Sequence, residues 1–165
     1  MAHTGQRVRP HADPPPPTPS VGAGRPRRGP RRVTLYVDTS ALLKRYVDEP
    51  DSRRADELLA SDPVLVTGRH TVVEVRRNLA RLLPATAAAD ARTSFAQDLA
   101  SFSIVELDAA TCELAATIGE QTGVRTLDAL HLGAARRLGT ALTFVSFDVR
   151  QAQAARSLGF SVAGA

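Results

Sequence analysis

Short apolar runs alternate with amphipathic or alanine-rich segments from Val33 to the end of the chain. The runs contain many β-branched and aromatic residues, which is typical of buried strands. They predict strands over residues 33–37, 64–66, 102–105, 142–145 and 160–162. The segments between them predict helices over residues 41–47, 51–60, 70–83, 85–100, 108–122, 126–138 and 148–158.

Strands that alternate with helices predict an α/β fold, with a central parallel sheet of four to five strands and helices on both faces. This is a three-layer α/β/α arrangement. In open parallel sheets, functional groups gather at the carboxyl ends of the strands. Asp38 directly follows the first predicted strand, and Asp148 follows the fourth by two residues. We therefore expect the two acids at the same edge of the sheet.

The first part of the chain has a different composition. Residues 1–32 hold eight of the eleven prolines, and seven arginines against one aspartate. Such a segment cannot bury enough apolar surface to offset the entropy of ordering it. We predict a disordered Pro/Arg-rich extension over 1–32 and one domain over 33–165. The extension is either an arm for nucleic acid or a dispensable addition from a misassigned start codon.

Composition excludes several classes of protein. The net charge is +4, but without the extension it is −2, so the high pI does not predict a basic patch in the fold. The single cysteine, Cys112, excludes an intramolecular disulfide and fits a reducing, cytoplasmic location. No apolar run is long enough for a membrane span. The motifs of zinc peptidases, P-loop NTPases and α/β-hydrolases are absent from the sequence.

Two further acids interrupt apolar stretches of predicted helices. Glu74 lies in Val72-Val-Glu-Val75, where an ion pair or hydrogen bond with Arg77 or Asn78 is the structural alternative. Asp128 lies in the first helical turn if Thr126 is the N-cap, and a carboxylate is favoured there by the helix dipole alone.

The four carboxylates Asp38, Glu74, Asp128 and Asp148 are more informative as a set. Converging acids repel one another and titrate at higher pH unless a cation compensates them. Hard divalent ions such as Mg²⁺ or Mn²⁺ are the usual partners of such oxygen-rich clusters. His131 follows Asp128 by three residues, but we interpret it as a core or surface histidine because the oxygen ligands do not need it.

The residues that carry these acids resemble a known family. Asp38-Thr-Ser-Ala-Leu-Leu, Glu74 in VVEVRRNLAR, Asp128 in TLDALHLGAA and Asp148 in FVSFDVRQAQAARSLGF are similar to PIN-domain ribonucleases. The resemblance is greatest to the VapC toxins of VapBC toxin–antitoxin modules. It covers about residues 33–162, with the four acids in the family's order, whereas the Pro/Arg-rich extension is atypical.

The resemblance implies a PIN-like fold and an RNA endonuclease in which one or two Mg²⁺ or Mn²⁺ ions activate water. It makes Asp38 and Asp128 the principal metal ligands, with Glu74 and Asp148 completing the pocket. Ser40 resembles the hydroxyl that orients the first carboxylate, and we expect Ser146 to act similarly near Asp148. The implied partners are an RNA substrate, tRNA or rRNA, a VapB-like antitoxin and a second copy of the chain in a homodimer.

Two alternatives from other classes remain open at this point. A phosphatase of the haloacid-dehalogenase type would use Asp38 as its nucleophile, but that pattern needs an acid two residues later, where this chain has Ser40. The other is a PIN-fold binding module that does not depend on catalysis. A requirement for Mg²⁺ or Mn²⁺ in RNA hydrolysis separates the nuclease from the phosphatase, and an Asp38→Asn protein with full biological effect would indicate the binding module.

Overall fold

The computed structural model of the chain describes residues 7–9, 34–61 and 64–165. Its strands form one parallel sheet in the order β3-β2-β1-β4-β5, which confirms the predicted α/β class. The strands are β1 (Leu35–Val37), β2 (Leu65–Gly68), β3 (Ser103–Val105), β4 (Thr143–Ser146) and β5 (Ser161–Gly164). The helices are α1 (Thr39–Leu43), α2 (Ser52–Ala60), α3 (Thr71–Leu82), α4 (Ala85–Leu99), α5 (Ala109–Thr122), α6 (Thr126–Arg136) and α7 (Val149–Ser157).

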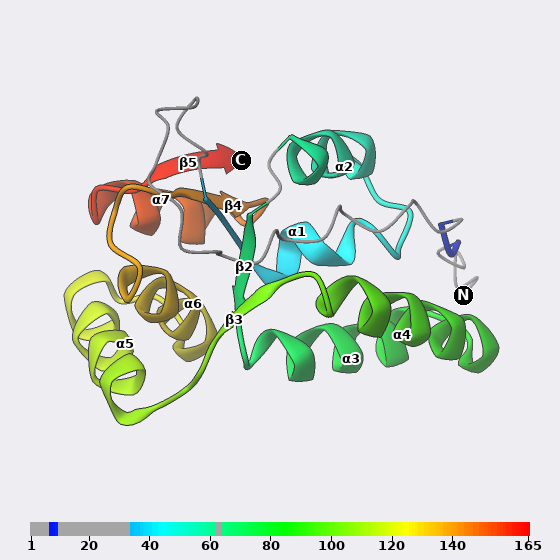
Figure 1. The fold of residues 1–165 in the computed structure, drawn as a ribbon, viewed down its shortest axis with the longest axis horizontal. Coiled ribbons are helices and arrows are strands. Elements are labelled where there is room, and N and C mark those ends of the chain that lie inside the picture. The colour runs from blue at the N-terminus through cyan, green and yellow to red at the C-terminus, as the bar shows by residue number, and fades with distance from the viewer. Residues whose placement is uncertain (1–6, 10–33, 62–63) are drawn as a thin grey trace, which may run out of the picture.

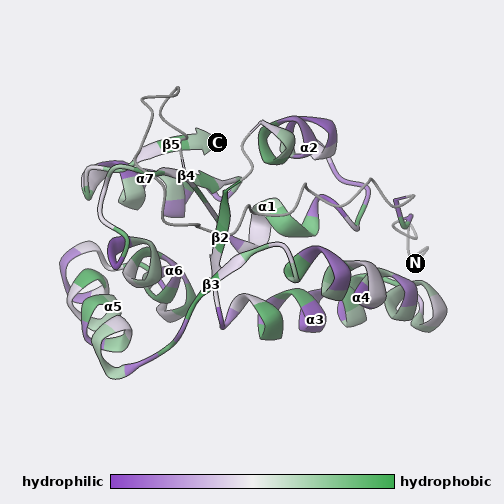
Figure 2. Ribbon diagram, viewed as in Figure 1, coloured by the Kyte–Doolittle hydropathy of each residue, from purple (hydrophilic) through white to green (hydrophobic). Residues whose placement is uncertain are grey.

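Two hydrophobic cores lie on opposite faces of the sheet, and strand β1 contributes to both. Leu35 and Val37 pack in a core with helices α1 to α4, whereas Tyr36 packs in the other core with α5, α6 and α7. Figure 1 shows these two groups of helices on either side of the strands. In Figure 2 the central strands β2 and β4 are mostly hydrophobic, while α2 is hydrophilic on the side away from the sheet. The predicted three-layer α/β/α architecture is confirmed.

The strand order places a change of direction beside β1. The chain proceeds from β1 to β2 and β3 on one side, and then returns to β4 on the other side of β1. Ligand sites in open parallel sheets form at such switch points, at the carboxyl ends of the strands. Val37 pairs with Val145, so β1 and β4 end at the same level, and the backbone N–H of Asp38 donates to the carbonyl of Val145 at 3.1 Å.

Most helix ends lie within one or two residues of the prediction, and the largest differences are at α1. Helix α1 begins at Thr39 rather than at residue 41, because the carboxylate of Asp38 caps it. It ends at Leu43 because backbone N–H groups that follow bond to carbonyls only three residues earlier. The Arg45 N–H, for example, donates to the Leu42 carbonyl. The capping position of α6 is Arg125 rather than Thr126, since the backbone is extended at Arg125.

The predicted extension falls mostly outside the described residues, so its disorder stays a prediction. Of its residues, 7–9 are described and lie against the domain. Val8 forms an antiparallel bridge with Val47, and the guanidinium of Arg9 pairs with Asp56 at 2.7 Å. Within the described ranges, none of the helices has the length and apolar character that crossing a membrane requires.

Candidate active site

Four acidic side chains line one hollow of about 180 Å³ at the carboxyl edge of the sheet. Asp38 comes from the end of β1, Glu74 from α3, Asp128 from the first turn of α6, and Asp148 from the segment between β4 and α7. The acids are far apart in the sequence, and the topology of the sheet brings them together.

Asp38 is the most buried of the four acids, with 1% of its surface exposed. Its Oδ1 accepts the backbone N–H of Ala41 at 2.9 Å, which caps α1. The hydroxyl of Ser40 donates to the same carboxylate, at 2.7 Å from Oδ1 and 3.0 Å from Oδ2. Burial raises the pKa of Asp38, although His131 and the hydrogen bonds from Ser146 and Ser40 oppose the rise. A nearby cation would therefore stabilise its ionised form.

The two serines predicted to support the site are Ser40, on α1, and Ser146, at the end of β4. Besides donating to Asp38, the Ser40 hydroxyl accepts the backbone N–H of Phe147 at 2.8 Å, which ties α1 to the end of β4. The Ser146 hydroxyl is fully buried and accepts the backbone N–H of Asp148 at 3.1 Å. Each serine thus fixes backbone next to an acid.

Asp148 is an exposed acid that also caps a helix. Its Oδ1 accepts the backbone N–H groups of Arg150 and Gln151, at 2.8 and 3.0 Å. Both bonds go to one oxygen, and no described residue donates to Oδ2. Capping and a role in the hollow are therefore compatible, because the cap uses only one oxygen of the carboxylate.

Glu74 is held by residues on two other elements. Its Oε2 accepts the Thr39 hydroxyl at 2.8 Å and lies 2.8 Å from Nε2 of His131. Burial raises the pKa of Glu74, but the hydrogen bonds from His131 and Thr39 outweigh it, so the pKa lies below its usual value. Asn78, one of the alternative partners, donates to the backbone carbonyl of Glu74 and not to its carboxylate. Arg77, the other, makes no ion pair with Glu74.

Asp128 is half-buried in the first turn of α6, as the sequence predicted. Burial raises its pKa, and the neighbouring charge of Asp148 raises it further, while His131 and Arg125 lower it. Burial is the larger cause of this shift, and repulsion from Asp148 adds to it. A nearby cation would stabilise the ionised form of Asp128.

His131 is buried, as a core histidine would be, but it also lines the hollow. Its Nε2 contacts Glu74, and its Nδ1 lies 3.2 Å from the hydroxyl of Tyr36. His70 packs against it with ring centroids 4.1 Å apart, and burial together with His131 lowers the pKa of His70 to about 3. The spacing of His131 one turn after Asp128 was the available signal. His70 and Thr39 gave none, because their contacts cross between elements.

Three acids of the hollow have no ion-pair partner. Among the described residues, Asp38, Asp128 and Asp148 have no Lys or Arg within ion-pair distance, although the charge of His131 lowers the pKa of Asp38 and of Asp128. Such an oxygen-rich set suits Mg²⁺ or Mn²⁺. Among the described residues, the group whose ligand atoms lie close enough to share a metal ion is Glu74 with His70 and His131, within 4.8 Å of one another.

Comparison with known families identifies the class of protein that this fold and site define. The family model of the PIN domain matches residues 35–157, which include all four acids of the hollow. The chain belongs to the PIN-domain family.

Two similar proteins are named VapC ribonucleases. The chain is 32% identical to Ribonuclease VapC46 and 34% identical to Ribonuclease VapC47, both of Mycobacterium tuberculosis, over 131 residues in each case. The matches cover 79% and 78% of this chain, and 96% and 95% of the relatives. The resemblance to VapC toxins that the sequence motifs indicated is confirmed.

Solved structures share the fold. The FitAcB structure from Neisseria gonorrhoeae has a TM-score of 0.64 at 21% identity, covering 78% of this chain and 96% of that one. The Mycobacterium tuberculosis toxin VapC20, described as cleaving the sarcin–ricin loop, has a TM-score of 0.59 at 21% identity. That match covers 80% of this chain and 98% of VapC20.

Proposed function

We propose that this chain is a Mg²⁺- or Mn²⁺-dependent RNA endonuclease that acts as the toxin of a type II toxin–antitoxin pair. The proposal rests on one observation: four carboxylates from four separate segments line one hollow, and three of them have no Lys or Arg partner in the described chain. Membership of the PIN family and two relatives named ribonucleases support the same activity.

In this proposal, Asp38 and Asp128 hold the cation, and Glu74 and Asp148 complete the site directly or through water. When bound, Mg²⁺ or Mn²⁺ supplies a water of lowered pKa and offsets the charge that develops on the phosphodiester. The protein's own contribution is positioning. Ser40 fixes both oxygens of Asp38, so the buried carboxylate has one orientation before any ligand arrives.

Glu74 and Asp148 each use one carboxylate oxygen for their contacts within the protein. The Oε2 of Glu74 is occupied by Thr39 and His131, and the Oδ1 of Asp148 is occupied by backbone amides. One oxygen of each acid therefore anchors the side chain, and the other stays available to a ligand. The lowered pKa of Glu74 keeps this carboxylate ionised at neutral pH.

The proposed substrate is a tRNA or an rRNA, and the proposed partners are a VapB-like antitoxin and a second copy of the chain. VapC20 is described as cleaving the sarcin–ricin loop, and other solved structures of this fold are a toxin–antitoxin complex from Klebsiella pneumoniae and a DNA-bound VapBC from Salmonella typhimurium. A cytoplasmic location follows from a substrate and a partner that are both found there.

The test is cleavage of total RNA by the purified protein, with the ends of the products sequenced. Wild-type protein should cut at defined sites with Mg²⁺ or Mn²⁺ and should stop when EDTA is added. Asp38→Asn and Asp128→Asn keep the size of the side chain but remove a charged ligand. Each should lower the cleavage rate by at least about 100-fold.

Asp90→Asn is the matched control, because Asp90 is an exposed carboxylate on α4 outside the hollow. It should cleave RNA like wild type. Near-normal cleavage by Asp38→Asn would show that the site is wrongly identified. Turnover of a phosphomonoester with a phosphorylated Asp38 would support the phosphatase instead. Normal biological effect of Asp38→Asn would support the binding module.

A further inference from the structure

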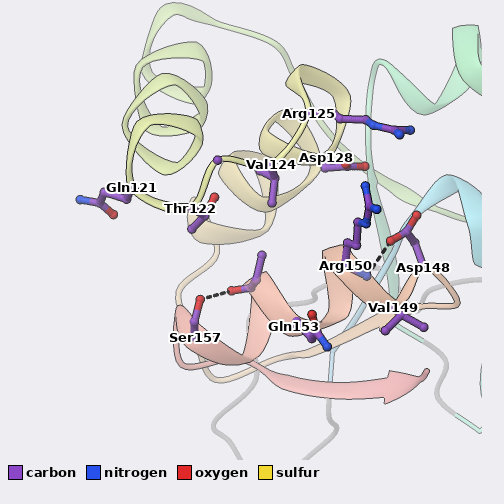
Figure 3. A pocket seen from close by; sticks show the side chains of 12 residues that line it. Gln121, Thr122, Val124, Arg125, Asp128, Asp148, Val149, Arg150, Gln153 and Ser157 are labelled. Atoms are coloured by element: carbon purple, nitrogen blue, oxygen red, sulfur yellow. Dashed lines mark hydrogen bonds between the residues drawn. The ribbon is translucent and has the colours of Figure 1, made fainter.

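A second and larger cleft adjoins the acidic hollow. It has a volume of about 790 Å³ and lies between the α5–α6 connection and α7. Its lining includes Asp128 and Asp148, which also line the hollow, so the two cavities adjoin at these acids. Figure 3 shows the cleft, with α6 on one side and α7 on the other. A volume of this size is typical of a ligand site.

Two arginines in the lining of the cleft offset the charge of these two acids. Arg125 lies at the start of α6 and Arg150 in the first turn of α7, and both are exposed. In Figure 3 the side chain of Arg150 extends from α7 towards Asp128, and Arg125 extends from the helix that carries Asp128. Both cations therefore lie beside the acids that the two cavities share.

Both guanidinium groups are available to a ligand. In the described part of the chain, neither makes a hydrogen bond or an ion pair within 4 Å. Other arginines differ, since Arg45 pairs with Asp98 and Arg137 pairs with Asp108. Unpaired arginines beside a cleft suit the planar oxygens of phosphate groups.

The rest of the lining offers hydrogen bonds and no stacking surface. Gln121 and Gln153 are exposed along the cleft, and no aromatic side chain is among its described lining residues. Gly123, which ends α5, has φ +66° and no atom within 4 Å of the place where a Cβ would lie, so the floor is open there. These features fit a sugar–phosphate backbone better than a stacked base.

We propose that this cleft binds the RNA backbone on one side of the scissile phosphate, with Arg125 and Arg150 contacting the flanking phosphates. The inference rests on the proposed ribonuclease function. The acids of the hollow repel an incoming polyanion, and cations at its border offset that repulsion. The same cations would repel a basic protein segment lying in the cleft, so RNA is the better occupant of the cleft.

The test compares two substrates. One is an RNA oligonucleotide that contains the mapped cleavage site, and the other is bis(p-nitrophenyl) phosphate, a diester without flanking phosphates. The variants are Arg125→Gln, Arg150→Gln and the double variant. The matched control is the double variant Arg76→Gln/Arg92→Gln, which removes two exposed arginines from a separate hollow between α3 and α4. Binding of the RNA in EDTA is measured by fluorescence anisotropy.

The KM for RNA should rise about tenfold in the Arg125/Arg150 double variant, with kcat nearly unchanged. The logarithmic salt dependence of RNA affinity should become shallower by about 0.7 for each arginine removed. Turnover of bis(p-nitrophenyl) phosphate should stay at the wild-type rate, because this substrate does not reach the cleft. The Arg76/Arg92 control should match wild type on both substrates.

The inference is overturned if the cleft variants keep the wild-type KM and salt dependence, or if the Arg76/Arg92 control changes both as much. It is also overturned if the cleft variants lose antitoxin binding but keep their RNA parameters, which would give the cleft to a protein partner. Failure of the proposed function is a different result, since wild type would then cleave neither substrate. RNA binding in EDTA that still depends on Arg125 and Arg150 would support the cleft in that case.

Discussion

At the scale of single residues, the site is built from short polar side chains that have two tasks. Asp38 and Asp148 both cap the helices that follow them and line the hollow. Capping supplies backbone N–H groups that hold a carboxylate in place, so the helix and the site are specified by the same residue. A capping aspartate at a strand end is ordinary in itself, and only convergence with other acids distinguishes it.

Replacement of Asp38 by Asn should stabilise the metal-free protein. Burial raises the folded-state pKa of Asp38 above its ordinary value of 3.8, so ionisation of this group opposes folding. An Asn at this position keeps an oxygen for the Ala41 amide and has no charge. We expect a melting temperature about 2–4 °C above wild type at pH 7 in EDTA, equivalent to about 1 kcal/mol.

The pH dependence of this gain has a definite sign. The folded state holds the Asp38 proton more tightly than the unfolded chain, so wild-type stability from this group is complete below pH 3.8 and is lost as pH rises through the raised pKa. The gain from Asp38→Asn should therefore be small in acid and reach a plateau near neutral pH. Thermal melts across this range test it, and a gain that shrinks as pH rises would contradict it. Mg²⁺ should stabilise wild type more than the variant.

At the scale of helices and strands, much of the fold was predictable because its signals are local. The buried strands are continuous apolar runs, and Pro84 and Gly123 mark helix ends in the sequence. The acids at strand ends were predictable for the same reason, since their order along the chain places them at one edge. The contact of Glu74 with His131 was not predictable, because it depends on how α3 and α6 approach each other.

A buried ion pair between elements should be the most sensitive contact outside the site. The Arg45 Nε donates to Oδ2 of Asp98 at 3.0 Å, and the Tyr46 hydroxyl donates to the same oxygen at 2.8 Å. Asp98 lies on α4 with 1% of its surface exposed. Asp98→Ala leaves the Arg45 charge buried with only the distant Asp56, at 3.8 Å, and should cost about 3–5 kcal/mol of unfolding free energy.

Urea unfolding measures this cost, with Asp90→Ala on the exposed face of the same helix as the control. The control should change the unfolding free energy by less than about 0.5 kcal/mol. Asp98→Asn should lie between Asp98→Ala and wild type, because its amide oxygen still accepts from Tyr46. A loss below about 1 kcal/mol for Asp98→Ala would show that the ion pair contributes little beyond its own desolvation.

At the scale of the whole molecule, the basic and acidic residues are concentrated in different parts of the chain. The first 32 residues carry most of the excess of arginine, and the domain is mildly acidic. Within the domain, the four acids lie at the switch point of the sheet, and Arg125 and Arg150 border them on one side. In the proposed function, an RNA substrate and an antitoxin would both approach the acidic hollow across a surface that carries both signs of charge.

The hollow should be the point at which an antitoxin inhibits this chain. A protein segment that directs an Arg or Lys into it would supply the positive charge that Asp38, Glu74, Asp128 and Asp148 lack, with forked hydrogen bonds to carboxylate in the case of Arg. That cation and Mg²⁺ would then compete for the same acids. We expect the apparent Kd of the antitoxin, encoded beside the toxin, to rise in proportion to Mg²⁺ once the metal site is half-filled, and inhibition to ease accordingly.

Titration of Mg²⁺ into the purified complex at constant ionic strength, followed by calorimetry, measures this competition. K⁺ at matched ionic strength controls for screening, and Asp90→Asn controls for loss of a carboxylate. An antitoxin affinity that is independent of Mg²⁺, and unchanged in Asp38→Asn and Asp128→Asn, would show that the antitoxin acts on another surface.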